Sequence, residues 1–255
     1  MTKAVNPVVR ALDLLRALNQ QPQSSLSRLH QATGLPKSTV HRLLMTLKSE
    51  GYVKNDVVKG VYSLTEKVRT LCDGYTEHDL VVEVGAAVLL RTTRETGLPL
   101  AIGTLHGGRI MVRYSSMPYS PIGSEHTTLG HVHDLMKSAM GQAYLAYCPE
   151  PEQERLVQLL ATRKADSVEE AGLERRVGQA IASTRQRGYA LRKPSKPGSS
   201  ATVAIPLLLG DEILGVLGLT TFAALINDKS VGECLAVLTG ARAEILEEIS
   251  RHGQG

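Results

Sequence analysis

The sequence contains few aromatic residues. Among its 255 residues there is no tryptophan and one phenylalanine, and aromatic residues make up 4% of the chain. Proteins that bind single-stranded DNA or RNA commonly stack the bases on aromatic side chains. The composition therefore argues against a platform for single-stranded nucleic acid.

Cysteine is also scarce: Cys72, Cys148 and Cys234 stand far apart and form no CxxC pair. This excludes a disulfide framework and a zinc or iron–sulfur site built on cysteine, and it fits a reducing cytoplasm. No apolar run reaches the roughly 18–20 residues that span a bilayer, and residues 1–10 lack a signal-peptide core. We therefore expect a cytoplasmic protein without a membrane partner.

Motifs of the common catalytic sites are missing. The chain has no Walker A, HExxH, GxSxG or SxxK motif, and Cys148 has no recognisable partner base. We therefore expect no enzymatic activity and no cofactor.

Positive charge is concentrated in the first third of the chain. Residues 1–75 carry eleven Lys and Arg against five Asp and Glu, a balance of +6, whereas the other residues have a balance of −2. One domain that meets a polyanion is expected to show this asymmetry. A solvated basic face gives the same composition, so charge alone does not decide between the two.

Periodicity and turn residues predict three helices in this basic region, at residues 7–20, 26–33 and 37–50, with a loop at residues 20–25. The first helix has one face with Val8, Leu12, Leu15 and Leu18, and the third has an apolar face with Val40, Leu43, Leu44 and Leu47. Two β-prone runs follow, at residues 52–54 and 61–64, and they flank a turn. Three helices and a hairpin, with a three-residue turn before the third helix, are typical of a winged helix-turn-helix.

The polar face of the third helix has the residue types that reading a major groove requires. Ser38 and Thr39 are small hydroxyl residues where the backbone approaches phosphate, and Arg42 lies one turn later with a side chain that reaches a base edge. The hairpin adds two lysines that are placed to hold the minor groove or the phosphates. An ordinary solvated helix is the alternative, but helix pattern, turn, hairpin and charge agree on double-stranded DNA. The predicted DNA contacts are Lys37, Ser38, Thr39, His41, Arg42, Thr46, Lys54 and Lys59.

The rest of the chain mixes strands with helices. Residues 65–77 are predicted as a linker helix between a domain at residues 1–64 and another at residues 78–255. The second domain has predicted strands at residues 98–105, 110–114, 202–209 and 214–221, and predicted helices at residues 80–96, 139–147, 151–161, 169–187 and 229–251. This pattern indicates an α/β (α+β) domain with one central sheet. The apolar stretch at residues 80–90 is either a core helix or a subunit interface.

A resemblance to a known family is carried by Ala32-Thr-Gly-Leu-Pro-Lys-Ser-Thr-Val-His-Arg-Leu-Leu-Met-Thr-Leu, followed by Glu50-Gly-Tyr-Val. The segment resembles the winged-helix signature of the IclR family of bacterial transcription factors. The likeness continues through Tyr62-Ser-Leu-Thr, Ser138-Ala-Met-Gly-Gln-Ala-Tyr-Leu-Ala and Ala201-Thr-Val-Ala-Ile-Pro. It implies an N-terminal winged helix-turn-helix and a C-terminal GAF-like effector-binding domain with a central antiparallel sheet. It also implies a dimer or a dimer of dimers that binds operator DNA.

The resemblance further implies an effector site on one side of the sheet that takes a small organic acid. Backbone N–H groups at the helix that begins near Ser138 would hold the carboxylate. The residues that the resemblance assigns to this site are Ile122, His133, Ser138, Ala139, Met140, Arg192, Thr202, Gly218 and Thr220.

Arg192 departs from the family pattern, which frequently has an aspartate in an acidic run at this place. An arginine beside the site suits a bidentate grip on a carboxylate, whereas a basic, solvated loop is the alternative. A narrower resemblance, to regulators of hydroxyphenylpropionate-type aromatic acid breakdown, rests on Lys67-Val-Arg-Thr-Leu and Leu145-Ala-Tyr-Cys-Pro-Glu. We therefore expect an aromatic or another carboxylic acid as effector.

A histidine-rich segment gives an alternative function. His126, His131, His133 and Asp134 fall within nine residues, and an extended His131-x-His133 segment points both imidazoles to one face. The alternative is thus a metal-binding sensor or an enzyme that uses His131 and His133 as ligands. A solvated polar loop explains the same residues without a metal.

Overall fold

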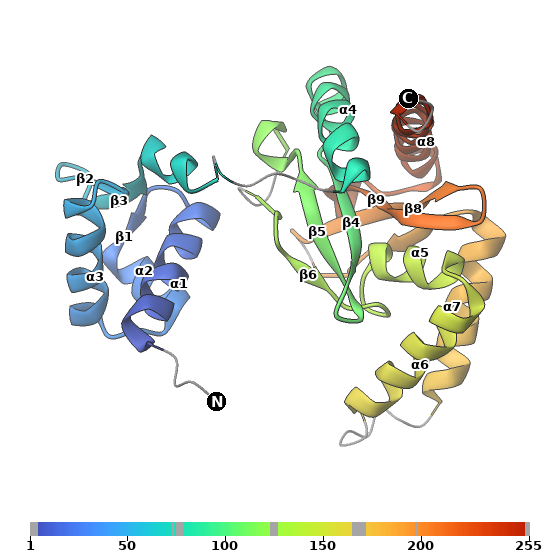
Figure 1. Cartoon of the computed structure of the whole chain (residues 1–255), viewed down its shortest axis with the longest axis horizontal. Coiled ribbons are helices and arrows are strands. Elements are labelled where there is room, and N and C mark those ends of the chain that lie inside the picture. Colours follow the sequence, from blue (N-terminus) through green and yellow to red (C-terminus); the bar gives the residue numbers. More distant parts are fainter. Residues whose placement is uncertain are drawn as a thin grey trace. The chain divides into compact units, whose positions relative to one another are not determined.

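The computed structural model describes residues 5–72, 74, 79–122, 127–164, 172–196 and 198–252. It divides into two compact units (Figure 1). The first comprises the described residues up to Gly74, and the second nearly all of those from Asp79 onward. The predicted linker at residues 65–77 falls at this division, and the domain boundaries given above stay predictions.

The N-terminal unit consists of three helices and a small antiparallel sheet. The helices are α1 (Asn6–Gln20), α2 (Leu26–Thr33) and α3 (Lys37–Ser49), and the strands are ordered β1 (Ser24–Ser25), β3 (Val61–Leu64) and β2 (Val53–Asp56). The predicted winged helix-turn-helix is confirmed. The loop predicted at residues 20–25 is partly wrong, because Ser24 and Ser25 pair with β3. The helix after the hairpin is a 3₁₀ helix, η1 (Glu66–Leu71).

Local signals explain why α2 begins and ends where it does. The Ser25 hydroxyl oxygen accepts the backbone N–H of Arg28 at 3.3 Å, as an N-cap does. Gly34 follows the helix in the left-handed conformation, with φ of 68°, which glycine adopts without steric cost. The His30 Nδ1 atom lies 2.6 Å from the carbonyl oxygen of Leu35. These contacts hold a short turn between α2 and α3.

The core of this unit uses only part of the apolar face that the sequence pattern marks on α1. Leu18 of that face is 1% exposed and Leu15 is half-buried, whereas Val8 and Leu12 are 56% and 46% exposed. Leu14, which lies outside the predicted face, is 0% exposed. The buried residues of α1 lie in its C-terminal half, so its N-terminal half extends past the core. The predicted apolar face of α3 is largely confirmed, with Leu43 only half-buried.

A six-stranded antiparallel sheet forms the centre of the C-terminal unit. Its strands are ordered β6 (Val132–His133), β5 (Arg109–Ser115), β4 (Leu100–His106), β9 (Glu212–Phe222), β8 (Ser200–Leu209) and β7 (Ala190–Arg192). The four central strands correspond to the four predicted ones. The edge strands β6 and β7 have no counterpart in the prediction, because two or three residues are too few to show a period.

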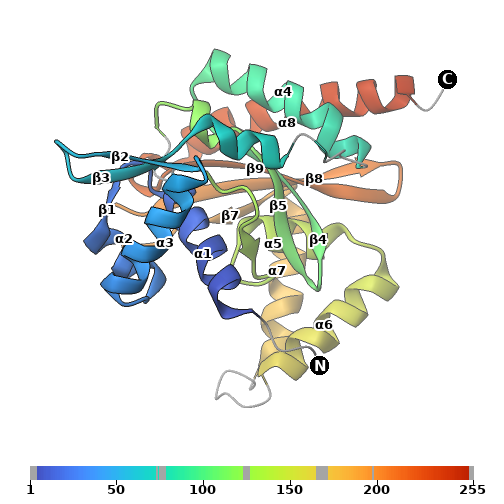
Figure 2. The same ribbon diagram turned by 60° about the vertical axis from the view of Figure 1, so that its left-hand side comes forward.

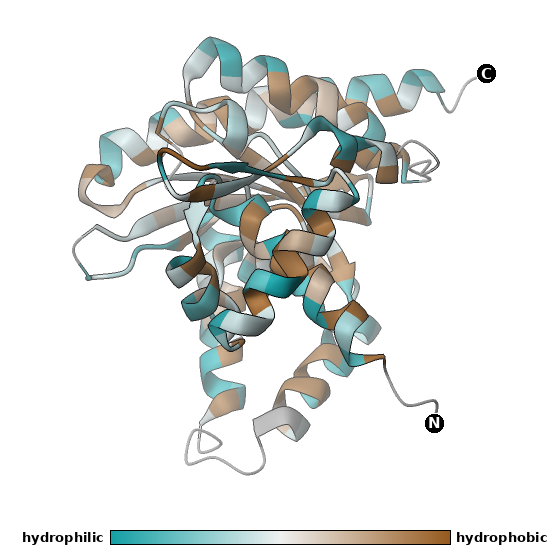
Figure 3. Cartoon of the chain, turned by 90° about the vertical axis from the view of Figure 1, so that its left-hand side faces the viewer, coloured by the Kyte–Doolittle hydropathy of each residue, from teal (hydrophilic) through white to brown (hydrophobic). Residues whose placement is uncertain are grey.

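Helices cover both faces of this sheet (Figures 1 and 2). One face carries α4 (Leu80–Thr96) and α8 (Asp228–His252), and the other carries α5 (Ala139–Tyr147) with α6 (Glu150–Lys164) and α7 (Leu173–Arg187). The helix that ends near the C label alternates between hydrophobic and hydrophilic residues, as expected when one side packs on a sheet (Figure 3). The predicted mixed architecture with one antiparallel sheet is confirmed.

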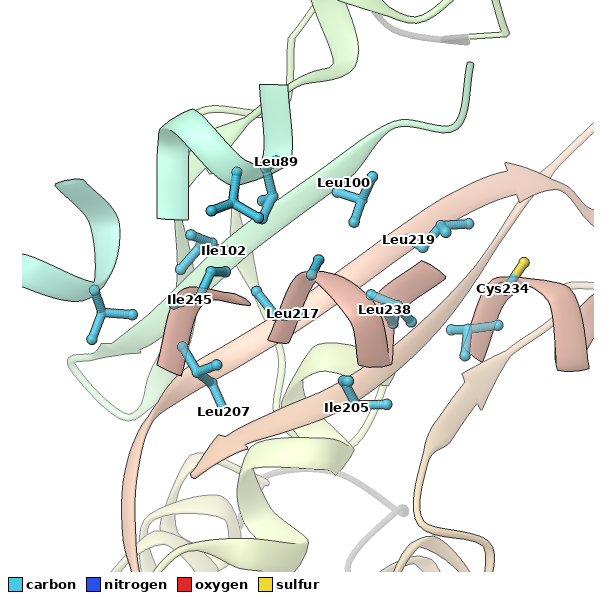
Figure 4. Close-up of a cluster of buried hydrophobic side chains, with 14 of the residues drawn as sticks. Leu89, Leu100, Ile102, Ile205, Leu207, Leu217, Leu219, Cys234, Leu238 and Ile245 are labelled. Atoms are coloured by element: carbon cyan, nitrogen blue, oxygen red, sulfur yellow. The ribbon is translucent and has the colours of Figure 1, made fainter. Parts of the chain in front are cut away.

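The face under α4 and α8 holds a large apolar cluster (Figure 4). Leu89 of α4 packs with Leu238 and Ile245 of α8 over Ile102 and Leu217 of the sheet, and all of them are 0% exposed. The apolar stretch at residues 80–90 is therefore a core helix of its own unit. Within the described ranges, no helix is long and apolar enough to cross a membrane.

Candidate functional site

The solvent face of α3 carries the helix residues that the sequence predicts to contact DNA. Those that are exposed are Lys37, Ser38, His41, Arg42 and Thr46, and Thr39 is half-buried. The Thr46 hydroxyl donates a hydrogen bond to the carbonyl oxygen of Arg42 at 3.2 Å. Val40 and Leu44 lie on the opposite face of the helix and are buried in the core. The cationic, hydroxyl-rich face can therefore contact a ligand without any change in the core.

The β2–β3 hairpin is the second exposed cationic feature of the N-terminal unit. Its turn is held by Asp56, whose Oδ1 accepts the backbone N–H groups of Val58 at 3.1 Å and Lys59 at 3.0 Å. The Lys59 Nζ lies 4.0 Å from Asp56 Oδ2, and Lys54 is exposed on β2. The hairpin thus exposes two lysines, and the Asp56 side chain holds its turn in one conformation.

Several predicted effector residues lie in one row across the C-terminal sheet. Arg192 is paired with Thr202, and Thr202 is paired with Thr220, so their side chains project from the same face. The two threonine hydroxyl oxygens are 3.2 Å apart. Arg192 is exposed on the edge strand β7. The row therefore has a hydroxyl pair next to a cationic edge, on the face that α5 covers.

Helix α5 begins above this face. Ser138 caps the helix: its Oγ accepts the N–H of Gly141 at 2.9 Å and donates to the Asp134 carbonyl oxygen at 2.7 Å. The cap uses one N–H of the first turn, and those of Ala139 and Met140 have no acceptor within the helix. Both residues are buried, at 1% and 4% exposure.

The structure places His133 at the far edge of the sheet from this row. His133 is on β6 and Arg192 is on β7, at opposite edges of the sheet. Five strand spacings of about 4.8 Å place them roughly 24 Å apart along the sheet, so one small acid does not reach both. Ile122 lies after η2 (Met117–Tyr119), where its N–H donates to the Ser120 hydroxyl at 3.3 Å.

Gly103 belongs with these residues, although the sequence pattern did not assign it to the site. A Cβ atom placed on Gly103 would lie 2.7 Å from Met140 Cε, and one on Gly218 would lie 3.1 Å from Met140 Cγ and Sδ. Met140 therefore lies directly over both glycines. The available signal was a glycine inside a strand, which often marks the close approach of another group.

The histidine alternative gains no support. His131 and His133 belong to no group of three or more His, Cys, Asp and Glu side chains among the residues that the structure describes. His126 lies outside the described residues. Burial raises the pKa of the Cys148 thiol to about 11, so this thiol is protonated at neutral pH and is a poor nucleophile.

Comparison with known families matches both units. Residues 7–57 match the IclR helix-turn-helix domain, and residues 74–245 match the C-terminal domain of the bacterial transcriptional regulator IclR.

Individual proteins give the same result. The HTH-type transcriptional regulator XynR of Escherichia coli K12 is 26% identical over 245 residues, which cover 89% of this chain and 90% of the relative. An IclR regulator from Alicyclobacillus acidocaldarius superposes with a TM-score of 0.59 at 23% identity, over 96% of this chain and 99% of its own. A Microbacterium hydrocarbonoxydans IclR homologue, solved with 4-hydroxybenzoate, has a TM-score of 0.59 at 14% identity and the same coverages. At these identities the two structures establish a shared fold.

Proposed function

The chain belongs to the IclR family of bacterial transcriptional regulators, and we propose that α3 and the β2–β3 hairpin recognise its operator while a small carboxylic acid in the C-terminal unit controls that binding. The observation that carries the proposal is the exposed face of α3, with Arg42 one turn beyond Ser38, in a unit that matches a helix-turn-helix domain. A protein that binds chromosomal DNA acts in the bacterial cytoplasm.

The DNA-binding residues divide by role. Ser38 and Thr39 allow α3 to approach the backbone, and Lys37 meets a phosphate near the helix N-terminus. Arg42 reaches a base edge, where a guanidinium donates two parallel hydrogen bonds to guanine. Sequence preference thus comes mainly from α3, and the hairpin lysines supply binding that does not depend on sequence.

Replacing a hairpin lysine is expected to weaken binding to all DNA duplexes alike. The binding constant falls as salt rises, and each phosphate contact that is lost makes the plot of log K against log salt less steep by about 0.9. We expect Lys54→Ala and Lys59→Ala to show this flatter slope in titrations of operator and unrelated DNA. The control is Lys229→Ala, an exposed lysine of α8 in the C-terminal unit, which should leave the slope unchanged. A loss of sequence preference at an unchanged slope would contradict the role given to the hairpin.

The acid site is proposed where the Thr202–Thr220 hydroxyl pair meets the first turn of α5. Two hydroxyl groups and the backbone N–H groups of Ala139 and Met140 are donors for a carboxylate, and hydrogen bonds to a charged group are stronger than neutral ones. Arg192 adds positive charge at the edge of the same row. An aromatic acid is proposed, because the Microbacterium homologue of the same fold was solved with 4-hydroxybenzoate.

Thermal unfolding of the full chain with aromatic and aliphatic carboxylates tests the acid site. An acid at about 100 times its Kd should stabilise the folded state by roughly 2.7 kcal/mol. Thr220→Val keeps the shape of the side chain but removes its hydroxyl, so the stabilisation should fall. If no acid changes the melting temperature of the unchanged protein, the effector part of the proposal is wrong.

An exposed apolar stripe on α1 supports a dimer. The stripe consists of Val8, Val9 and Leu12 of the helix, which are 56%, 44% and 46% exposed, and of its N-cap residue Val5, which is 64% exposed. Contiguous apolar surface of this kind commonly marks an interaction site, and we propose that a second copy of the chain covers it.

Leu12→Asp is expected to lower the mass of the assembly in solution, because the change puts a charge into that contact. Light scattering measures the mass directly. Val58→Asp is the matched control, since Val58 is 98% exposed in the same unit but lies on the hairpin. An equal mass for both variants would exclude the stripe as the interface.

A further inference from the structure

The side chain of Met140 fills the space over two glycines of the C-terminal sheet. Its Cγ and Sδ atoms lie over Gly218 of β9, 3.1 Å from where a Cβ atom would be. Its Cε lies over Gly103 of β4, 2.7 Å from where a Cβ atom would be, and shares that space with Ile110, whose Cγ2 would be 2.5 Å away. Gly103 and Gly218 lie on the adjacent strands β4 and β9. With 4% exposure, Met140 is almost completely buried there.

This filled space adjoins the polar part of the proposed acid site. A Cβ on Gly218 would lie 3.6 Å from Thr202 Cγ2, and the Thr202 hydroxyl is 3.2 Å from that of Thr220. The hydroxyl pair and the thioether are therefore neighbours over one patch of the sheet. An acid whose carboxylate is held by the threonines has its hydrocarbon part directed toward atoms that Met140 now occupies, or away from the sheet.

Methionine is suited to a space that its side chain fills when no ligand is bound and leaves when a ligand binds. Its side chain is unbranched, has three rotatable bonds and adapts to irregular spaces. Glycine within a strand weakens the strand and gives no side chain to the core. Both glycines therefore leave room, which Met140 fills over Gly218 and shares with Ile110 over Gly103. A branched side chain at residue 140 would fill the same room with fewer conformations.

We propose that Met140 sets the size of the acid that the C-terminal unit accepts. The hydrocarbon part of the acid displaces the Met140 thioether from Gly103 and Gly218, and the carboxylate binds at Thr202 and Thr220. The inference rests on the acid-binding function proposed above. Shortening residue 140 therefore enlarges the site, and the preference moves to longer acids.

The test compares benzoate with 3-phenylpropionate on the full chain, by calorimetric titration. The two acids differ by two methylene groups, and each buried methylene contributes roughly a factor of four in affinity. Met140→Ala vacates the place of Cγ, Sδ and Cε, so we expect it to shift the affinity ratio roughly tenfold toward 3-phenylpropionate. Met117→Ala is the matched control, because Met117 is buried to 5% exposure in η2 of the same unit and should leave the ratio unchanged.

Two additions keep the test decisive. Met140→Leu conserves volume and is well tolerated in cores, so it covers the case in which the alanine variant does not fold. Because leucine is stiffer than methionine, this variant should bind 3-phenylpropionate more weakly relative to benzoate. The neutral 3-phenylpropanol separates a site for acids from a simple hole, because it lacks the carboxylate that the threonines hold.

Each outcome has one meaning. A ratio that moves in Met140→Ala and not in Met117→Ala, with little binding of the alcohol, supports the inference. An unchanged ratio in both residue 140 variants overturns it and leaves the proposed acid site intact. If Met140→Ala gains equal affinity for the alcohol and for the acid, the inference is also overturned, because the variant then binds hydrocarbon in a cavity without using the carboxylate. If neither acid binds any form of the protein, this inference fails together with aromatic-acid binding.

Discussion

Replacing Arg42 with alanine is expected to lower the affinity for the operator by about 1–3 kcal/mol, which is roughly 5- to 150-fold, and to relax the preference at the base it reads. Arg42 is exposed one turn after Ser38 on the polar face of α3, so its loss leaves the buried side of the helix intact. Binding titrations against the operator and against single-base variants measure both effects.

Two further variants separate a base contact from a charge effect. Arg42→Lys keeps the positive charge but loses the planar fork that pairs with guanine, so it should retain most non-specific binding and lose specificity. Arg155→Ala removes an exposed arginine of α6, whose side chain is 65% exposed, and should change neither. If Arg42→Ala weakens all sequences equally, then Arg42 contacts phosphate and another residue reads the bases.

Gly141→Ala is expected to destabilise the C-terminal unit by about 3 kcal/mol, in the upper part of the range for overpacked cores. An added Cβ would lie 2.5 Å from Leu135 Cα and 2.6 Å from the Leu135 carbonyl oxygen, and it would also meet the Asp134 carbonyl. These are backbone atoms, so they cannot turn aside as a side chain can. For a unit of this size the melting temperature should fall by roughly 6–12 °C.

Gly178→Ala is the matched control for that change. Gly178 lies in α7, and nothing is within 4 Å of a Cβ placed there. Alanine is the better helix former by roughly 0.5–1 kcal/mol, so the same substitution should raise stability slightly. A Gly141→Ala protein as stable as the Gly178→Ala protein would contradict the close approach of α5 to residues 134–135. Because Gly141 follows Met140, a folded Gly141→Ala protein should also bind acids less well.

Much of the N-terminal unit could be predicted, because its elements are specified by neighbouring residues. Ser25 and Gly34 bound α2, and Val40, Leu44 and Leu47 give α3 one buried face. The pattern in α1 was ambiguous for a physical reason. Apolar residues occur on more than one of its faces, and only the packing of the other helices decides which of these residues are buried.

The acid site could be predicted in part. Thr202, Gly218 and Thr220 were assigned to it by resemblance, and their register places them on one face of the sheet. The separation of His133 from Arg192 depends on strand order, which brings residues far apart in sequence together and leaves no local signal. The occupation of the space over Gly218 by Met140, and of that over Gly103 by Met140 and Ile110, depends on side-chain packing, which no spacing rule describes.

Selection of duplex DNA from a random library by the full chain tests the central claim most directly. The predicted result is an enriched pseudo-palindrome whose half-sites are separated by about one helical turn or a multiple of it. Selection with the Arg42→Ala protein should enrich this sequence much less. A library that stays random, with all duplexes bound equally, would contradict sequence-specific recognition by α3. A single isolated half-site would contradict recognition by a dimer.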